Sequence, residues 1–158
     1  MTSLDDMPAA LRSVQTRPLF VMTLTVGDIH GIGGEQRIID VTGGSFTGER
    51  LSGTVLSGGA DWQTIRGDGA VLLDVRLVLR TDDGATIAMT YPGIRHGPPD
   101  VVERVGRGEQ VDPASYYFRI APGFATDAPR YAWLNRIVAV GVGHRIASGP
   151  IYSVFEIL

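Results

Sequence analysis

Apolar and polar residues alternate along most of this chain in short runs that end at glycine or at Asp-Gly. Residues 71–80 show the pattern most clearly. Their odd-numbered positions are all apolar and consist of Val71, Leu73, Val75, Leu77 and Leu79. Their even-numbered positions are mixed and consist of Leu72, Asp74, Arg76, Val78 and Arg80. Because successive side chains of a strand point to opposite faces, this run predicts a β-strand with one buried face.

Runs of the same kind predict strands through most of the sequence. Residues 69–93 predict a hairpin, because Asp83-Gly84 suits a tight turn between two apolar segments. Further strands are expected within residues 18–28, 37–48, 49–59, 115–124, 131–145 and 150–158, with glycine pairs at several of the bends. Residues 100–105 follow two prolines and precede Gly106, which suits one or two helical turns.

These elements predict an all-β protein with about eight or more strands and one or two short helical segments. Many short strands with few helices are typical of an antiparallel barrel or sandwich. We expect residues 1–17 to form an N-terminal segment that has room for a turn of helix, and residues 18–158 to form one β domain. The length of 158 residues, with 44% hydrophobic and 20% charged residues, is that of one domain with a sizeable core.

Composition excludes several classes of chemistry. The chain has no cysteine, so disulfides, thiolate nucleophiles and cysteine-bound metals are excluded. It has no lysine either, which excludes a Schiff-base lysine and a P-loop lysine. The net charge is -3 and the arginines are scattered, which argues against nucleic acid as a partner.

Other motifs are missing as well, and we therefore expect neither a cofactor nor a metal. The three histidines lie in separate segments without metal-ligand spacing, and no glycine-rich dinucleotide loop precedes a helix. The N-terminal residues resemble no targeting signal and no run approaches the roughly 20 apolar residues of a membrane span, which predicts a cytoplasmic protein without membrane contact. The apolar residues Leu72 and Val78 on the mixed face would allow a homo-oligomer.

Seven short motifs occur in a fixed order along the chain. They read GGSFTGERLSG, GADW, DGAVLLDVR, TDDGA, YYFR, PGFAT and YAWLN. The ordered set resembles the bacterial family called domain of unknown function 3237, over about residues 19–158. The resemblance implies a compact antiparallel β-barrel, and it implies no established reaction. A looser analogy of architecture connects such barrels with allene oxide cyclase and dirigent proteins, but fold analogy alone does not transfer function.

Asp61 and Trp62 are the first candidate site residues. They follow Gly58-Gly59 at the expected end of a strand, where barrel loops commonly build sites. A carboxyl group beside an indole can have a raised pKa and act as a general base. The alternative is that Asp61 accepts backbone hydrogen bonds in a turn while Trp62 closes the end of the barrel.

Two interpretations also stay open for the strand 71–80. In one, the apolar face points inward, and Asp74 and Arg76 are solvated or ion-paired on the outside. In the other, Arg76 lies inside the barrel and stabilises a developing negative charge, for which a guanidinium group is well suited. Asp74 is then a second, weaker candidate for the base, and Arg119 a second candidate for holding the oxyanion.

Aromatic residues with polar tips suggest a pocket for a flat, partly apolar ligand. The candidates for its lining are Tyr91, Tyr116, Tyr131, Trp133 and Asn135. The sequence thus predicts a small-molecule-binding barrel, with catalysis of an isomerase, cyclase, hydratase or lyase type by acid/base chemistry. The alternative is a non-catalytic ligand-binding barrel or a structural oligomeric barrel.

Overall fold

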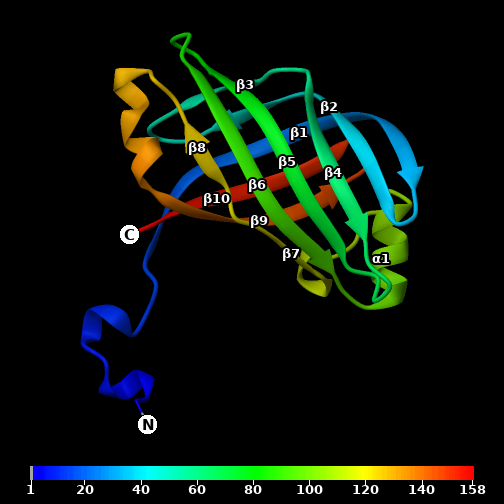
Figure 1. Cartoon of the computed structure of the whole chain (residues 1–158), viewed down its shortest axis with the longest axis horizontal. Helices are drawn as coiled ribbons and strands as arrows, with labels where there is room; N and C mark the ends of the chain where they lie inside the picture. Colours follow the sequence, from blue (N-terminus) through cyan, green and yellow to red (C-terminus); the bar gives the residue numbers. More distant parts are fainter. Residues whose placement is uncertain (1) are drawn as a thin grey trace.

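The computed structural model describes residues 2–158, which fold around one antiparallel sheet (Figure 1). Its first strands are β1 (Thr16–Gly33), β2 (Gln36–Thr47), β3 (Ser52–Val55), β4 (Gly59–Ile65) and β5 (Val71–Thr81). The later strands are β6 (Thr86–His96), β7 (Tyr117–Ile120), β8 (Gly123–Ala125), β9 (Val138–Ile146) and β10 (Gly149–Ile157). One α-helix, α1 (Pro99–Gly106), and four 3₁₀ turns, η1 (Leu4–Asp6), η2 (Ala9–Leu11), η3 (Pro113–Ser115) and η4 (Pro129–Arg136), complete the described part of the chain.

The sheet closes on itself. Antiparallel pairing runs from β5 through β4, β2, β1, β10, β9, β7 and β6 and returns to β5. Where β4 does not extend, β3 pairs with β2 and β5 in its place. In the same way, β8 pairs with a part of β6 that β7 does not cover. The predicted all-β antiparallel barrel is therefore confirmed, and the closed ring removes the exposed edges that an open sheet would have.

The predicted hairpin is present as β5 and β6, paired without interruption from Val71 and Arg95 to Arg80 and Thr86. Gly84 has φ = 88° in the connecting turn, a left-handed conformation that glycine adopts without steric cost. The odd-numbered residues of β5 are buried and the even-numbered ones from Asp74 to Arg80 are exposed. The apolar face of β5 therefore points into the barrel, which is the first of the two interpretations of this strand.

Residues 131–136 differ from the prediction, because they belong to η4 rather than to a strand. Pro129 stands at the start of this 3₁₀ segment, where its missing N–H costs nothing. Tyr131 and Leu134 are buried, and their spacing of three residues puts them on the same side of a 3₁₀ turn. The strand β9 begins only after Ile137, which is already extended.

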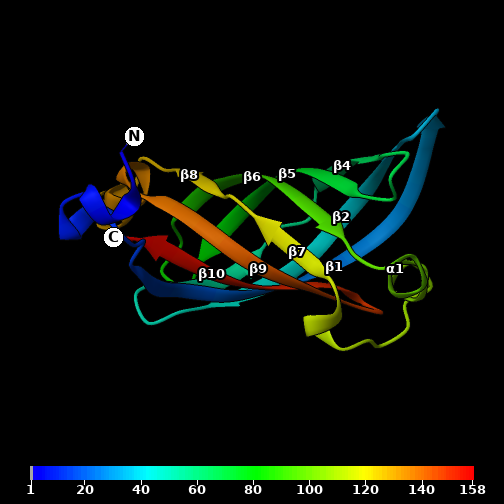
Figure 2. The same cartoon turned by 90° about the horizontal axis from the view of Figure 1, so that it is seen from below.

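The two ends of the barrel are built differently. α1 lies at the end reached by the hairpin of β1 and β2, whose tip extends beyond the other strands (Figure 2). η4 and the two chain termini lie at the opposite end (Figures 1 and 2). The opposite end is filled by aromatic packing, with the ring centroids of Phe20 and Phe46 5.5 Å apart and those of Phe20 and Phe124 6.0 Å apart.

The end of the barrel near α1 is covered by this helix, and the cavity described below lies there. Val101 and Val105 of α1 are buried against the barrel. None of the helices in residues 2–158 has the length and apolar character needed to cross a membrane.

Candidate functional site

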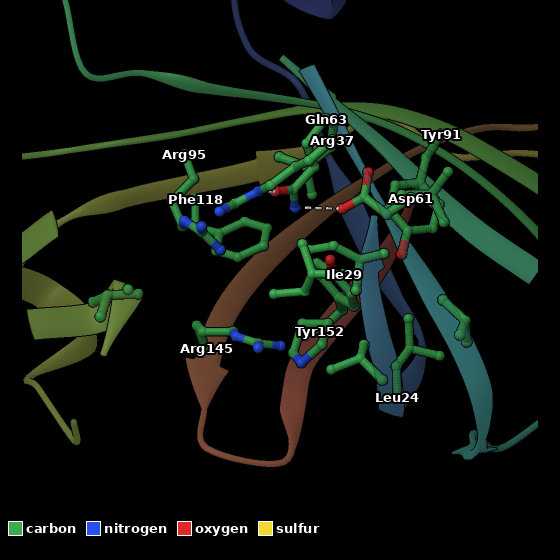
Figure 3. A pocket seen from close by; sticks show the side chains of 18 residues that line it. Leu24, Ile29, Arg37, Asp61, Gln63, Tyr91, Arg95, Phe118, Arg145 and Tyr152 are labelled. Carbon is green, nitrogen blue, oxygen red and sulfur yellow. Dashed lines mark hydrogen bonds between the residues drawn. The ribbon is translucent and has the colours of Figure 1, made fainter. Parts of the chain in front are cut away.

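A cavity of about 80 Å³ lies inside the barrel near α1. Its walls are largely aliphatic and aromatic, with contributions from Leu24, Ile39, Val41, Leu73, Val75 and Phe118. Its polar lining consists of Arg37, Asp61, Gln63, Tyr91, Arg95, Arg145 and Tyr152 (Figure 3). Apolar walls with a few convergent polar groups are typical of small-molecule sites.

Asp61 reaches this cavity because of its position on β4. Asp61 and Gln63 are buried and the intervening Trp62 is exposed, as alternation along a strand requires. The Asp61 side chain accepts a hydrogen bond from Gln63 Nε2 at 2.6 Å and another from the backbone N–H of Asp74 at 3.3 Å. Gln63 in turn accepts a hydrogen bond from Arg37 Nε at 2.9 Å. Gln63 therefore links a guanidinium group to the buried carboxyl group (Figure 3).

Burial raises the pKa of Asp61 above its ordinary value. The residue is only 8% exposed, so its ionised form loses most of its contact with water. The hydrogen bonds from Gln63 and Asp74 and the charges of Arg95 and Arg37 act in the opposite direction, but burial is the largest effect. Asp61 thus holds a proton more readily than a solvated aspartic acid does.

Arg95 lies on the inner side of β6 and is 9% exposed. Its guanidinium carbon lies 5.5 Å from the centroid of the Phe118 ring, on the neighbouring strand β7. Burial lowers the pKa of Arg95, and the positive charge of Arg145 lowers it further. Arg145, on β9, is partly buried at the same cavity, and burial lowers its pKa as well.

Two tyrosines complete the polar lining. Tyr91 and Tyr152 are both 1% exposed, with ring centroids 5.5 Å apart in an edge-to-face arrangement. Burial raises the pKa of both hydroxyl groups, so both stay protonated at neutral pH. Within residues 2–158, the buried Tyr91 hydroxyl makes no well-formed hydrogen bond, although the Tyr152 hydroxyl is close enough to raise its pKa further.

The structure thus brings two of the sequence candidates, Asp61 and Tyr91, to one cavity. It places Trp62, Asp74, Arg76 and Arg119 outside. Trp62 is 55% exposed and lines a second depression together with Asp74. Arg76 is exposed on the outer face of β5, because Leu73, Val75 and Leu77 occupy the inner positions. The prediction of an interior Arg76 is corrected by this register.

Arg119 also lies away from the cavity. Its guanidinium carbon lies 4.5 Å from the centroid of the Tyr117 ring, and its Nη1 donates to the carbonyl oxygen of Phe118 at 2.9 Å. Phe118 and Ile120, its neighbours on β7, are the buried residues of that strand. The oxyanion-binding role predicted for Arg119 therefore has no support in its position.

The remaining aromatic candidates do not meet at the cavity. Tyr116 is buried beside it and fixes the backbone of β9, because its hydroxyl accepts the N–H of Arg145 at 2.7 Å. Tyr131 belongs to η4 and donates a hydrogen bond to Asp83 at 2.9 Å. Trp133, also on η4, packs under the guanidinium group of Arg50.

Asn135 has a structural role at the same end of the molecule. Its side chain accepts the N–H of Thr126 at 2.9 Å and donates to the carbonyl oxygen of Thr126 at 2.8 Å. The pocket-lining role predicted for Tyr131, Trp133 and Asn135 assumed a strand, and the 3₁₀ conformation of η4 separates them from the cavity.

Five polar residues of the cavity were missed by the sequence analysis. They are Arg37, Gln63, Arg95, Arg145 and Tyr152. Two of them could have been found from strand alternation. Gln63 lies two residues after Asp61 and Arg95 four residues after Tyr91, so each points to the same side of its strand as that candidate. The other three come from strands that only the closed barrel brings to the same place.

In residues 2–158, no three or more His, Cys, Asp or Glu side chains lie close enough together to hold a metal ion. His30 Nε2 pairs with Asp40 at the surface at 3.0 Å. His144 Nδ1 lies 2.8 Å from the Tyr116 hydroxyl.

Residues 14–157 match the family model described as "Protein of unknown function (DUF3237)". The chain belongs to this family. The match confirms the resemblance found in the ordered motifs. The UPF0311 protein RPA1785 of Rhodopseudomonas palustris is 38% identical over 150 residues, which cover 92% of this chain and 98% of that protein.

Solved structures of similar proteins share the fold. The crystal structure of the Rhodopseudomonas palustris protein superimposes with a TM-score of 0.89 at 39% identity, covering 92% of this chain and 98% of that one. A protein of Acinetobacter baumannii described as β-barrel like gives a TM-score of 0.79 at 37% identity, covering 92% and 97%. An enzyme from Penicillium herquei gives 0.70 at 23% identity, covering 92% and 95%, a likeness that shows the fold alone.

Proposed function

We propose that this DUF3237 protein is a cofactor-independent enzyme that performs an acid/base step on a small, partly apolar substrate in the barrel cavity. The step would be an isomerisation, cyclisation, hydration or elimination. The observation that carries the proposal is the buried carboxyl group of Asp61, whose pKa is raised and whose side chain lines a cavity with apolar walls. A positioned group of this kind typically contributes about 10²- to 10⁴-fold to a reaction rate.

Each polar group of the cavity has a role in this proposal. Asp61 transfers the proton, and Gln63 holds the carboxyl group by its hydrogen bond from Nε2. Arg95 takes the role that the sequence analysis gave to Arg76, because its guanidinium group faces the cavity and can hold a negatively charged oxygen of the substrate, whether that charge is already present or develops in the reaction. Tyr91 and Tyr152 offer hydroxyl groups that can orient a bound carbonyl compound.

The size of the cavity limits the substrate. Its volume of about 80 Å³ is well below the roughly 300–1,000 Å³ of pockets for drug-sized ligands. A compound of only a few carbon atoms fits it without rearrangement.

A cytoplasmic location and a homo-oligomeric state belong to the same proposal. Val78 on the outer face of β5 is 39% exposed and Leu72 is partly buried on the same face. A symmetric pair of such faces would remove this apolar surface from water. Analytical ultracentrifugation checks the oligomeric state directly.

Deuterium exchange tests the acid/base step without knowledge of the natural substrate. Butanone and 2-oxobutanoate, each with exchangeable hydrogens beside a carbonyl group, are incubated with the protein in D₂O and analysed by mass spectrometry. We expect exchange above the buffer rate with the wild-type protein, and a loss of about 100-fold or more in Asp61→Asn. Asp74→Asn, the same change on the outer face of β5, should keep the wild-type rate.

Equal exchange in the wild type and in folded Asp61→Asn would refute the proposed role of Asp61. Binding of either compound, observed by saturation-transfer NMR, without exchange above the buffer rate would instead favour the non-catalytic binding barrel.

A further inference from the structure

Two guanidinium groups face the cavity without an acidic partner. Among the described residues, no salt bridge and no side-chain hydrogen bond involves the guanidinium group of Arg95 or of Arg145. Both side chains lie on the same side of the cavity as Phe118 (Figure 3). Arg95 is 9% exposed, so water replaces the missing partner only in small part.

The charges of the cavity do not balance. Arg37, Arg95 and Arg145 supply three positive charges, while Asp61 is the one acidic side chain in the lining that the structure describes. Even a fully ionised Asp61 therefore leaves two positive charges uncompensated. Arg95 is buried and Arg37 and Arg145 are partly buried, and removing a charge from water without a partner costs free energy that a ligand of opposite charge would offset.

A third unused donor points to the same cavity. The buried hydroxyl group of Tyr91 makes no well-formed hydrogen bond within residues 2–158, and its polar neighbour is the Tyr152 hydroxyl, which lines the same cavity. A buried donor without an acceptor also costs free energy. Tyr91 comes from β6 and Arg145 from β9, so two parts of the barrel wall offer donors to the same space.

We propose that the ligand of this cavity is a small carboxylate with an apolar body, bound through its carboxylate group by Arg95 and Arg145. The inference rests on the proposed function, because it names the class of substrate on which Asp61 acts. Guanidinium groups match the planar carboxylate group and bind it through short, charge-assisted hydrogen bonds. The apolar body packs against Phe118 and Val75, which line the same space.

Phosphate is the other common partner of paired arginines, and the cavity suits it less well. A free phosphate has no apolar part, and it would leave the aliphatic walls of the cavity without contact. Its second negative charge would also meet the carboxyl group of Asp61.

Calorimetric titration with matched pairs of small molecules tests the inference. The pairs are butyrate with butyramide and propionate with propionamide, and inorganic phosphate is titrated separately. We expect the wild-type protein to bind at least one carboxylate about tenfold or more tightly than its amide. Arg95→Gln and Arg145→Gln should each weaken that binding by about tenfold or more, while Arg76→Gln, on the outer face, should leave it unchanged.

Loss of folding is distinguished from loss of binding by thermal melting of each variant. Arg95→Lys keeps the positive charge and should retain part of the affinity that Arg95→Gln loses. Three results would overturn the inference: amides that bind as well as the acids, phosphate that binds more tightly than either carboxylate, or unchanged carboxylate affinity in both glutamine variants.

The two proposals fail in different ways. Exchange of butanone that depends on Asp61, together with equal binding of acids and amides, would overturn the carboxylate site and keep the acid/base step. Carboxylate binding that depends on Arg95, together with exchange that ignores Asp61, would keep the carboxylate site and overturn the acid/base step.

Discussion

Replacing Asp61 with asparagine should change how the stability of the barrel depends on pH. The carboxyl group of Asp61 is buried, and burial raises its pKa above the value of 3.8 for an unperturbed aspartic acid. Between that value and the raised pKa, the folded state binds more protons than the unfolded state. The free energy of unfolding of the wild type therefore falls as the pH rises through this window, and asparagine removes that fall.

Two contributions of different kind set the size of the effect. The first depends on pH and amounts to about 1.4 kcal/mol for each unit by which the pKa is raised. The second does not. Gln63 Nε2 and the N–H of Asp74 donate to different oxygen atoms of Asp61, whereas asparagine offers one oxygen. The lost hydrogen bond should cost Asp61→Asn about 1 kcal/mol at every pH.

Urea denaturation of both proteins at intervals between pH 4 and pH 8 measures the two contributions separately. The variant should be less stable than the wild type at the acid end, and this deficit should shrink or reverse as the pH rises. The difference between the two proteins cancels the titration of all other groups that they share. Asp74→Asn, an exposed substitution on the outer face of β5, should stay within about 0.5 kcal/mol of the wild type throughout.

The opposite slope would refute this reasoning. If the wild type gained stability over Asp61→Asn with rising pH, the carboxylate of Asp61 would be stabilised in its ionised form by Arg37 or Arg95. Burial would then not be the dominant effect, and the role of Asp61 as a proton-transfer group at neutral pH would lose its basis.

Three further substitutions test the cavity lining, the packing around Phe118 and the ion pairs of Glu156. Tyr91→Phe removes a buried hydroxyl that makes no well-formed hydrogen bond and should raise the stability of the ligand-free protein by about 1 kcal/mol in thermal melting; a clear loss would show that the hydroxyl is bonded to that of Tyr152. Gly143→Ala would bring its Cβ to 2.4 Å from the ring of Phe118 and should cost about 1–3 kcal/mol, whereas Gly31→Ala meets no atom within 4 Å and should cost far less in the same assay. Glu156→Gln weakens hydrogen bonds from two arginine side chains and should cost about 1 kcal/mol at neutral pH; because those bonds lower the pKa of Glu156, the cost should shrink in acid, and a cost that stays constant down to pH 3 would contradict the ion pairing.

The fold was predictable because its strands carry their own signals. The hairpin of β5 and β6 combines strict alternation with an Asp83-Gly84 turn, and both features depend on neighbouring residues alone. The bend at Asp68 and Gly69 is local in the same way, since Asp68 accepts the N–H of Ala70 at 3.1 Å. Such local chemistry is visible in a sequence without knowledge of the tertiary structure.

The conformation of η4 was predicted wrongly although its signals were present. Tyr131, Trp133 and Asn135 alternate in a way that also suits a strand, and the prediction followed this alternation without considering Pro129. A proline at the first position and buried residues three apart favour a 3₁₀ turn instead. The error also affected the predicted site, because it assigned these three residues to the lining of a pocket that they do not reach.

The polar cavity was harder to predict, because residue type and position point in opposite directions. Arginine is rarely buried without a partner, so its residue type alone does not predict that Arg95 points into the barrel. On β6, however, Ile87, Met89, Tyr91 and Arg95 are all buried and share the same parity. Along β6, the inward side chains change from the apolar Ile87 and Met89 of the core to Tyr91 and Arg95, which line the cavity. The alternation is that of an ordinary barrel strand, and only the residue types change along it. The polar end of β6 therefore results from the residue types at its inward positions and needs no change in the backbone. In the same way, one barrel fold can carry different binding sites.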